Sequence, residues 1–173
     1  MDEAETWPDS IHRVLSELEV RQVAYVPDAG HGRLIRLCQE DPAMIEVPLT
    51  TEEEGIALLA GAWLGGDRGV LLMQSSGVGN CVNMLTLSRT CRFPLLTLVT
   101  MRGEWGEFNP WQLPMGQSAR EVLETAGVIV QRLEERADAE FQVAAAGRMA
   151  FEGQVPVAVL IAQRLIGAKS FQK

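Results

Sequence analysis

The stretch TTEEEGIALLAGAWLGGDRGVLLMQSSGVGN, from Thr50 to Asn80, sets the pattern of the whole chain. It joins a helix expected over Glu52–Leu64 to a strand expected over Val70–Met73 through a short polar turn. The strand is a continuous apolar run without alternation, which is typical of a parallel strand covered on both faces. A helix followed directly by such a strand indicates an α/β fold.

The same alternation continues on both sides of this stretch. The other expected strands are Val23–Val26, Ile45–Val47, Leu95–Thr100, Val128–Val130 and Val157–Ala162. The other expected helices are Ser10–Glu19, Gly32–Gln39, Asn80–Thr90, Ala119–Ala126 and Glu134–Phe151. Strands linked by helices predict an α/β protein with a single open six-stranded parallel sheet and helices on both faces. We expect residues 1–173 to form one domain.

The composition is that of a globular protein, with 47% hydrophobic and 22% charged residues. A net charge of −8 argues against nucleic acids and anionic membranes as partners. Cys38, Cys81 and Cys91 lack the C-x-x-C spacing of metal and redox sites, so we expect reduced thiols. The acidic Met1–Glu5 has no signal-peptide pattern, and no apolar run reaches membrane-spanning length. These features predict a cytoplasmic protein, and two histidines with scattered acids predict no metal site on this chain.

Three acids, Glu52, Glu53 and Glu54, open a helix that is apolar on nearly every side. Such a helix belongs inside a protein, so we expect at least one acid at a buried boundary, where a carboxylate can do proton chemistry. The alternative is helix capping, because Thr50-x-x-Glu53 and Thr51-x-x-Glu54 both fit a capping box. If Glu53 and Glu54 serve the cap, Glu52 remains as the functional candidate.

A polar segment with two glycines, Gln74–Asn80, follows the strongest strand. Gly77 and Gly79 form only a partial dinucleotide fingerprint, since its third glycine is replaced by Val82. Two interpretations stay open. The segment is either a tight turn that needs glycine, or a ligand position at the carboxyl end of a strand.

Two further segments attract attention. Val26–Gly32 follows another strand and contains Asp28 and His31. Asp28 could cap the next helix while His31 is solvated, or both could line a catalytic pocket, where histidine titrates usefully. Gly103–Gly116 is expected to be a long loop before a helix that starts near Ser118, and long loops in compact domains are usually functional or part of an interface.

These segments together resemble a known family. Glu52–Ala62 resembles the conserved glutamate helix of thiamine-diphosphate enzymes. The decarboxylases of sulfopyruvate and phosphonopyruvate are similar in the segments Val26–Asp28, Gln74–Asn80 with Asn83, Arg102–Glu104 and Gln112–Gly116. The resemblance runs from about Asp9 to Ala162 and implies a free-standing pyrimidine-binding domain. It implies the α subunit of a thiamine-diphosphate-dependent 2-oxo acid decarboxylase that converts 3-sulfopyruvate to sulfoacetaldehyde and CO₂.

The resemblance also implies roles for individual residues. The family pattern, counted back from Gly61, places the catalytic glutamate on Glu52, which would hydrogen-bond the N1′ atom of the cofactor's aminopyrimidine. The other residues expected at the cofactor are Ser75, Gly77, Gly79 and Asn80. A sulfonate or phosphonate needs cationic or N–H partners, and the residues expected at the substrate are Asp28, His31 and Arg102. Many relatives have a histidine where Leu113 follows Gln112, which leaves the exact 2-oxo acid open.

A second chain is expected to complete the site. The family binds Mg²⁺ and diphosphate through Gly-Asp-Gly and downstream asparagines, whereas Gly65–Gly69 here is only a polar turn. The resemblance therefore implies a β subunit with that motif, a hetero-oligomer, and thiamine diphosphate at their interface, with Gly103–Gly116 in the contact. The alternatives are a decarboxylase or carboligase for another 2-oxo acid such as phosphonopyruvate, a non-catalytic assembly or regulatory homologue, and a nucleotide-binding module.

Overall fold

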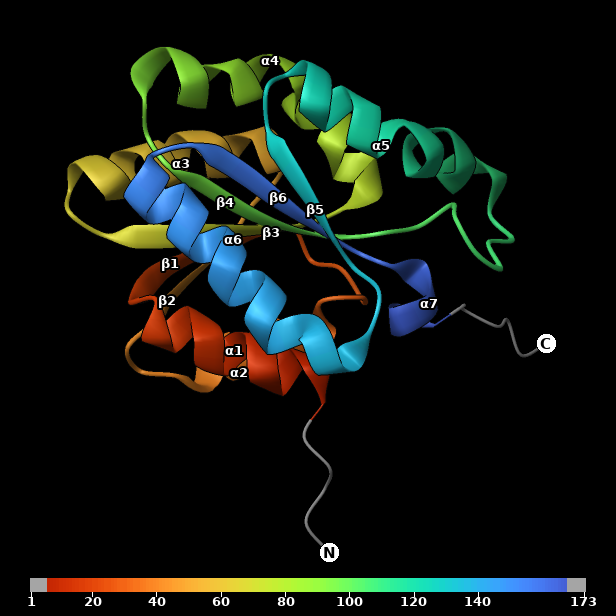
Figure 1. The fold of residues 1–173 in the computed structure, drawn as a ribbon, viewed down its shortest axis with the longest axis horizontal. Coiled ribbons are helices and arrows are strands. Elements are labelled where there is room, and N and C mark those ends of the chain that lie inside the picture. Colours follow the sequence, from red (N-terminus) through yellow and green to blue (C-terminus); the bar gives the residue numbers. More distant parts are fainter. Residues whose placement is uncertain (1–5, 168–173) are drawn as a thin grey trace, which may run out of the picture.

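The computed structural model describes residues 6–167, so Met1–Glu5 lie outside the described residues, and it confirms the expected architecture (Figure 1). All six strands are present and parallel, in the order β2-β1-β3-β4-β6-β5. The strands are β1 (Val20–Tyr25), β2 (Ile45–Pro48), β3 (Arg68–Gln74), β4 (Leu95–Thr100), β5 (Ile129–Leu133) and β6 (Pro156–Ile161). The carboxyl ends of parallel strands share one edge of the sheet, and the segments singled out above follow several of these ends.

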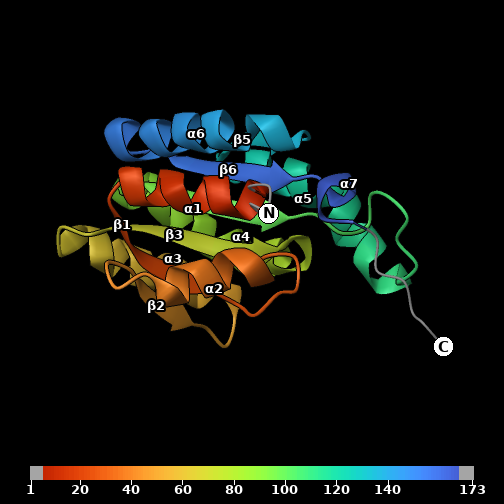
Figure 2. The same cartoon turned by 90° about the horizontal axis from the view of Figure 1, so that it is seen from below.

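The helices cover both faces of this sheet. The α-helices are α1 (Trp7–Glu17), α2 (Gly32–Glu40), α3 (Glu52–Leu64), α4 (Ser75–Cys91), α5 (Leu113–Thr125), α6 (Ala139–Gly153) and the short α7 (Gln163–Ile166). Two 3₁₀ turns, η1 (Pro110–Gln112) and η2 (Arg136–Asp138), precede α5 and α6. One face is covered by α6, α1 and α2, which lie side by side in Figure 2. The other face is covered by α3, α4 and α5. No helix within residues 6–167 is long and apolar enough to cross a membrane.

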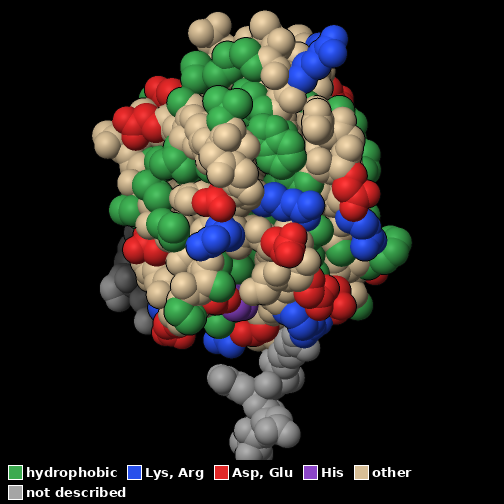
Figure 3. All heavy atoms as spheres, turned by 90° about the vertical axis from the view of Figure 1, so that its left-hand side faces the viewer, with side chains coloured by type: hydrophobic (Ala, Val, Ile, Leu, Met, Phe, Trp, Pro, Cys, Tyr) green, Lys and Arg blue, Asp and Glu red, His purple; other side chains and the backbone are tan. Residues whose placement is uncertain are grey.

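The two helical layers differ in their outer surfaces. Helix α1 buries Ile11 and Leu15 against the sheet and turns Arg13 and Glu17 toward solvent, as an amphipathic surface helix should. In Figure 3, charged side chains gather mostly in the lower half, on the side of α1 and α2, and hydrophobic side chains gather in the upper half. The expectation that the glutamate helix is buried is therefore only half right, because α3 buries its inner side and leaves an apolar outer side exposed.

Two local expectations are wrong for physical reasons. Helix α4 begins at Ser75, directly after β3, so Gly77 and Gly79 lie in its first turns and form no separate turn. The expected loop Gly103–Gly116 is shorter, because α5 already begins at Leu113. Pro110 and Pro114 stand in the first turns of η1 and α5, where the missing N–H of proline costs no helical hydrogen bond.

Candidate active site at the carboxyl ends of the strands

Glu52 is the centre of the candidate site. It is the first residue of α3 and is 7% exposed. The side-chain amide of Asn80, on α4, donates a hydrogen bond of 2.7 Å to Oε2 of Glu52. Among residues 6–167, no hydrogen bond to the other oxygen, Oε1, is found. The carboxylate is thus oriented through one oxygen, and within the described residues the other oxygen remains available to a ligand.

Gly77 makes room for this carboxylate. A Cβ atom added at Gly77 would overlap the carboxyl group of Glu52. Glycine in a helix is less favourable than alanine by about 1 kcal/mol, which is why a sequence pattern with Gly77 suggests a turn. The structure gives a different reason for the glycine: it allows α3 and α4 to approach closely at the carboxylate.

The other two acids stabilise the entry to α3. Oε2 of Glu54 accepts a hydrogen bond of 3.0 Å from the backbone N–H of Thr50, and Oε2 of Glu53 accepts one from the hydroxyl of Thr51. The hydrogen bond from Thr51 lowers the pKa of Glu53. Thr51 is the N-cap residue, but its side chain makes no capping bond, so the reciprocal capping boxes do not form. Glu53 and Glu54 therefore bond to the residues that precede α3, whereas Glu52 bonds to Asn80 on α4.

An open cavity of about 800 Å³ adjoins Asn80. Its lining residues are Ser76, Gly79, Asn80, Pro110, Trp111, Pro114 and Met115. The cavity is bounded by α4 on one side and by η1 and the start of α5 on the other, and Trp111 is 82% exposed. One polar wall and one apolar wall suit a planar heteroaromatic ring. Ser75 is buried instead and accepts a hydrogen bond of 3.1 Å from the backbone N–H of Arg102.

Asp28 lies on a second, smaller cavity of about 240 Å³ beyond β1 and β4. Its carboxylate accepts hydrogen bonds from the amide of Gln74, at 2.9 Å, and from the hydroxyl of Thr100, at 2.6 Å. Burial opposes the charge, but the hydrogen bond from Thr100, the neighbouring His31 and the hydrogen bond from Gln74 together lower the pKa of Asp28. Asp28 is therefore an anion at neutral pH. It does not cap α2, whose N-cap residue is His31.

His31 is the clearest correction among the predicted site residues. It is fully buried, and its Nε2 lies 3.0 Å from the carbonyl oxygen of Leu98 in β4. Burial lowers the pKa of His31, so the ring is neutral. It is neither a solvated loop residue nor part of a cavity wall, because the connection between β1 and α2 turns its side chain back into the sheet. Contact with a substrate is excluded in this conformation.

Arg102 lines the smaller cavity and is paired with Glu107, a residue that the sequence analysis did not single out. Nε and Nη2 of Arg102 donate to the two oxygens of Glu107 at 2.6 and 2.7 Å. The Glu107 side chain is only 2% exposed, and the hydrogen bonds from Arg102, followed by those from Asn109 and Gln163, lower its pKa to about 2 against the effect of burial. In the sequence, the only sign of this ion pair is that Glu107 follows Arg102 by five residues.

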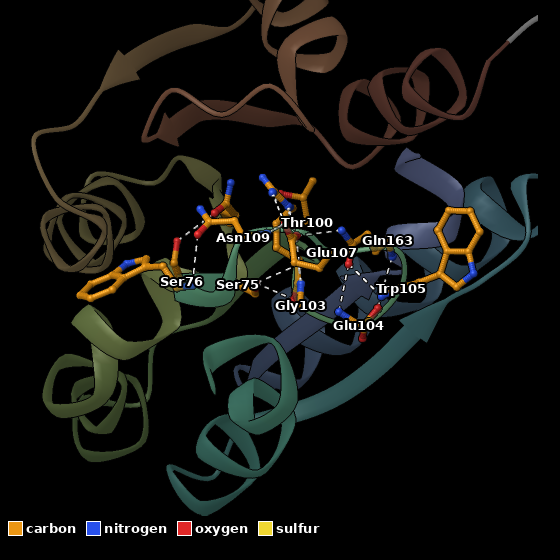
Figure 4. A network of polar contacts seen from close by, with 12 residues as sticks. Ser75, Ser76, Thr100, Gly103, Glu104, Trp105, Glu107, Asn109 and Gln163 are labelled. Atoms are coloured by element: carbon orange, nitrogen blue, oxygen red, sulfur yellow. Dashed lines mark hydrogen bonds and ion pairs between the residues drawn. The ribbon is translucent and has the colours of Figure 1, made fainter. Parts of the chain in front are cut away.

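The same network fixes the segment that carries the aromatic residues (Figure 4). The side-chain oxygen of Gln163 accepts hydrogen bonds from the backbone N–H groups of Glu104 and Trp105 at 2.9 and 3.0 Å. Gly103 adopts a positive φ of 78°, and a Cβ there would overlap the backbone of Gln112. The segment is therefore held between β4, α5 and α7. No group of three or more His, Cys, Asp or Glu that could hold a metal occurs within the described part of the chain.

Known proteins resemble this chain over most of its length. The sulfopyruvate decarboxylase subunit alpha of Methanocaldococcus jannaschii is 31% identical over 152 residues, which cover 87% of this chain and 90% of the relative. The sulfopyruvate decarboxylase of Methanosarcina acetivorans is 40% identical over 121 residues, which cover 69% of this chain but 31% of the relative. The phosphonopyruvate decarboxylase of Streptomyces viridochromogenes is 39% identical over 112 residues, which cover 28% of that relative.

A solved structure shares the fold. The 2-oxoglutarate:ferredoxin oxidoreductase from Magnetococcus marinus superposes with a TM-score of 0.78 over 94% of this chain and 29% of that chain, at 17% sequence identity. No family model matches the chain. The long, nearly end-to-end match at 31% identity decides the assignment: the chain belongs to the family of sulfopyruvate decarboxylase α subunits.

Proposed function

We propose that this chain is the pyrimidine-binding α subunit of a thiamine-diphosphate-dependent decarboxylase that converts 3-sulfopyruvate to sulfoacetaldehyde and CO₂. The observation that carries the proposal is the state of Glu52: a nearly buried carboxylate with one oxygen held by Asn80 and the other free, beside an open cavity. The relatives whose names include sulfopyruvate decarboxylase support the substrate. We also propose that residues 1–173 form a single pyrimidine-binding domain.

The residues around Glu52 fit the aminopyrimidine half of the cofactor. Thiamine diphosphate, when bound, supplies the nucleophilic carbon and the electron sink that decarboxylation of a 2-oxo acid requires. Glu52 would hydrogen-bond the ring nitrogen and exchange a proton with it through Oε1, while Asn80 keeps the carboxylate oriented. Gly77 leaves the space that this orientation needs. Ser76 and Gly79 would border the ring on the polar side of the cavity, and Trp111 would shield it from water on the other.

The smaller cavity is our candidate for the substrate. Asp28, as a stable anion, accepts hydrogen bonds there, and Arg102 still has three of its five N–H donors after pairing with Glu107. Among residues 6–167, Arg102 is the one cation on the cavity wall. Because Asp28 and Glu107 balance its charge, we place further contacts to the sulfonate on the partner subunit.

A β subunit would supply Mg²⁺ and the diphosphate-binding residues. The Methanocaldococcus jannaschii relative, which this chain covers to 90%, is named subunit alpha. The Methanosarcina acetivorans relative has no subunit in its name, and this chain covers only 31% of it. The remaining two thirds of that relative are available to carry the functions that Gly65–Gly69 cannot provide here. We therefore propose a hetero-oligomer in which the cofactor bridges the two chains. We place it in the cytoplasm, since the three cysteines are free thiols.

The test is a reconstitution. The purified chain is combined with thiamine diphosphate, Mg²⁺ and the chain from the same source that carries Gly-Asp-Gly and downstream asparagines. We expect release of CO₂ and sulfoacetaldehyde from 3-sulfopyruvate by the pair, and none by either chain alone. Full turnover by this chain alone would refute the divided site. Phosphonopyruvate belongs in the same assay, because the match to a phosphonopyruvate decarboxylase makes it the second candidate substrate.

A further inference from the structure

Arg102 is fixed at the smaller cavity through both its backbone and its side chain. Its backbone N–H donates a hydrogen bond of 3.1 Å to the hydroxyl of Ser75 on α4, and its guanidinium pairs with Glu107 through Nε and Nη2. This pairing uses one edge of the guanidinium. It leaves two N–H donors on Nη1 and one on Nη2 for a ligand in the cavity that Arg102 lines. The position of Glu107 therefore decides where these donors point.

The carboxylate of Glu107 is held mostly from within its own segment. Residues 101–109 connect β4 to η1 without a helix or strand. The backbone N–H groups of Gly103 and Asn109 donate hydrogen bonds to the carboxylate at 3.4 and 3.0 Å. In the described part of the chain, one donor comes from outside this segment: Nε2 of Gln163 lies 3.0 Å from Oε2 of Glu107. Gln163 therefore fixes the carboxylate relative to the rest of the fold.

Gln163 itself has a well-defined place in the fold. It is the first residue of α7 and is 1% exposed. Its Oε1 accepts the hydrogen bonds from the backbone N–H groups of Glu104 and Trp105, and the strand before α7, β6, pairs with β4. Helix α7 also forms part of the wall of the smaller cavity through Ile166, with Gly167 directly after it. The same short helix thus borders the cavity and holds the acid that directs the guanidinium.

The position of Gln163 requires an amide. One end of the side chain faces two backbone N–H groups, and the other end faces the Glu107 carboxylate (Figure 4). A carboxylate here would still accept from the two N–H groups but would place a like charge against Glu107. The two cations of this network, Arg102 and Arg132, are already paired with acids and would not neutralise it. An apolar side chain would leave both N–H groups and the carboxylate without their partner.

We infer that Gln163 is a positioning residue for substrate binding: through Glu107 it directs the free donors of Arg102 into the smaller cavity, where they bind the sulfonate of 3-sulfopyruvate. This role rests on the proposed function. The sulfonate takes no part in the bond that breaks when CO₂ leaves, so its contacts stabilise the bound substrate and the transition state equally. The effect of Gln163 should therefore appear in KM and leave kcat nearly unchanged.

The test is the steady-state kinetics of the reconstituted complex with 3-sulfopyruvate. Gln163→Glu keeps the shape of the side chain and replaces the donor to Glu107 by a carboxylate. Gln163→Asn keeps a neutral amide that is one methylene too short, and it carries the test if the first variant does not fold. The matched control, Gln142→Glu, makes the same change on α6, where the amide donates to Gln131. Circular dichroism melting measures the folding of each variant.

We expect Gln163→Glu to raise KM at least about 10-fold near neutral pH and to keep kcat within about threefold of the parent. Gln163→Asn should raise KM at least about threefold, and Gln142→Glu should change neither constant. The excess in KM of Gln163→Glu over the parent should shrink as the pH is lowered. Two adjacent carboxyl groups raise the pKa of one of them, and the protonated form can again donate a hydrogen bond to Glu107.

The outcomes separate this role from the proposed function. A parental KM in both Gln163 variants would overturn the inference while turnover of 3-sulfopyruvate by the parent complex upholds the proposed function. A loss confined to kcat or to thermal stability would also overturn it, because a merely structural role predicts that result. An excess in KM that does not change with pH would mean that the effect does not pass through Glu107. If the parent complex releases no CO₂ from 3-sulfopyruvate, the proposed function fails and the role of Gln163 fails with it.

Discussion

The two helical layers cover the same sheet with helices of opposite character. Helices α1 and α2 each have an apolar side on the sheet and a charged side in water, with Arg36 and Glu40 among the exposed residues of α2. Helix α3 makes the same contact with the sheet and adds a second apolar side. Covering a sheet requires only one apolar side of a helix. Covering the sheet therefore does not account for the extra apolar side of α3, which lies on the layer that carries Glu52.

The two helical layers should differ most in how turnover responds when an acid on each layer is replaced. Glu52→Gln removes the proton-exchanging carboxylate and should lower turnover of 3-sulfopyruvate by about 10²–10⁴-fold. Glu40→Gln, on the exposed side of α2, should leave turnover unchanged. CO₂ release by the reconstituted complex measures both. Parental turnover in Glu52→Gln would show that the chain only assembles or regulates the complex.

A pair of glycines on α4 sharpens the assignment of Glu52. Gly77→Ala would push a methyl group into the carboxyl group of Glu52 and should reduce turnover by roughly 10- to 100-fold, as small misplacements of catalytic groups do. At Gly79 the new methyl would lie 3.4 Å from the sulfur of Met115, a flexible neighbour. Gly79→Ala would narrow the cavity without displacing Glu52, so it should reduce turnover less than Gly77→Ala and raise helix stability by up to about 1 kcal/mol. Similar losses in both variants would mean that Gly77 matters for packing alone.

Two carboxylates, one near each helical layer, should make the free energy of unfolding depend on pH. The pKa of Glu107 is about 2, lowered mainly by Arg102, and that of Asp9 at the start of α1 is about 2, lowered mainly by Arg33. A carboxyl group with a lowered pKa in the folded state contributes stability above its unfolded pKa and loses it as pH falls through the folded value.

We therefore expect the free energy of unfolding to decline from about pH 5 to pH 2, measured by urea titration. Glu107→Gln and Asp9→Asn should each lower stability at pH 7 and flatten the decline. Only Glu107→Gln should also weaken turnover, since Arg102 loses its partner beside the smaller cavity. An unchanged pH profile in both variants would contradict the assigned pKa shifts.

The smallest effect is expected on the outer side of α2. Arg36→Glu reverses a charge on an exposed helical position and should change stability by less than about 0.5 kcal/mol. It should leave the affinity for the partner subunit and turnover at their parental values. A clear loss of partner affinity in this variant would mean that the water-facing layer also takes part in assembly.

The sequence sufficed where a pattern spans many residues or one position stands out from its neighbours. Apolar runs and helix periodicity predicted all six strands, and the capping pattern separated Glu53 and Glu54, which bond to Thr51 and Thr50, from the buried Glu52. It failed where the cause lies in another part of the chain. Gly77 responds to a carboxylate 25 residues away, and the burial of His31 depends on the carbonyl of Leu98 in β4. No local pattern contains such long-range contacts.

The uncovered side of α3 also has a consequence for how much of this chain a cell can hold. Each copy made in excess of a partner exposes the apolar outer side of α3. Other unassembled copies and chaperones can bind such a surface. Balanced synthesis of the two polypeptides would then be a requirement of the fold itself. Orphan copies are expected to precipitate or to be degraded, and their lifetime should lengthen when the partner is produced alongside them.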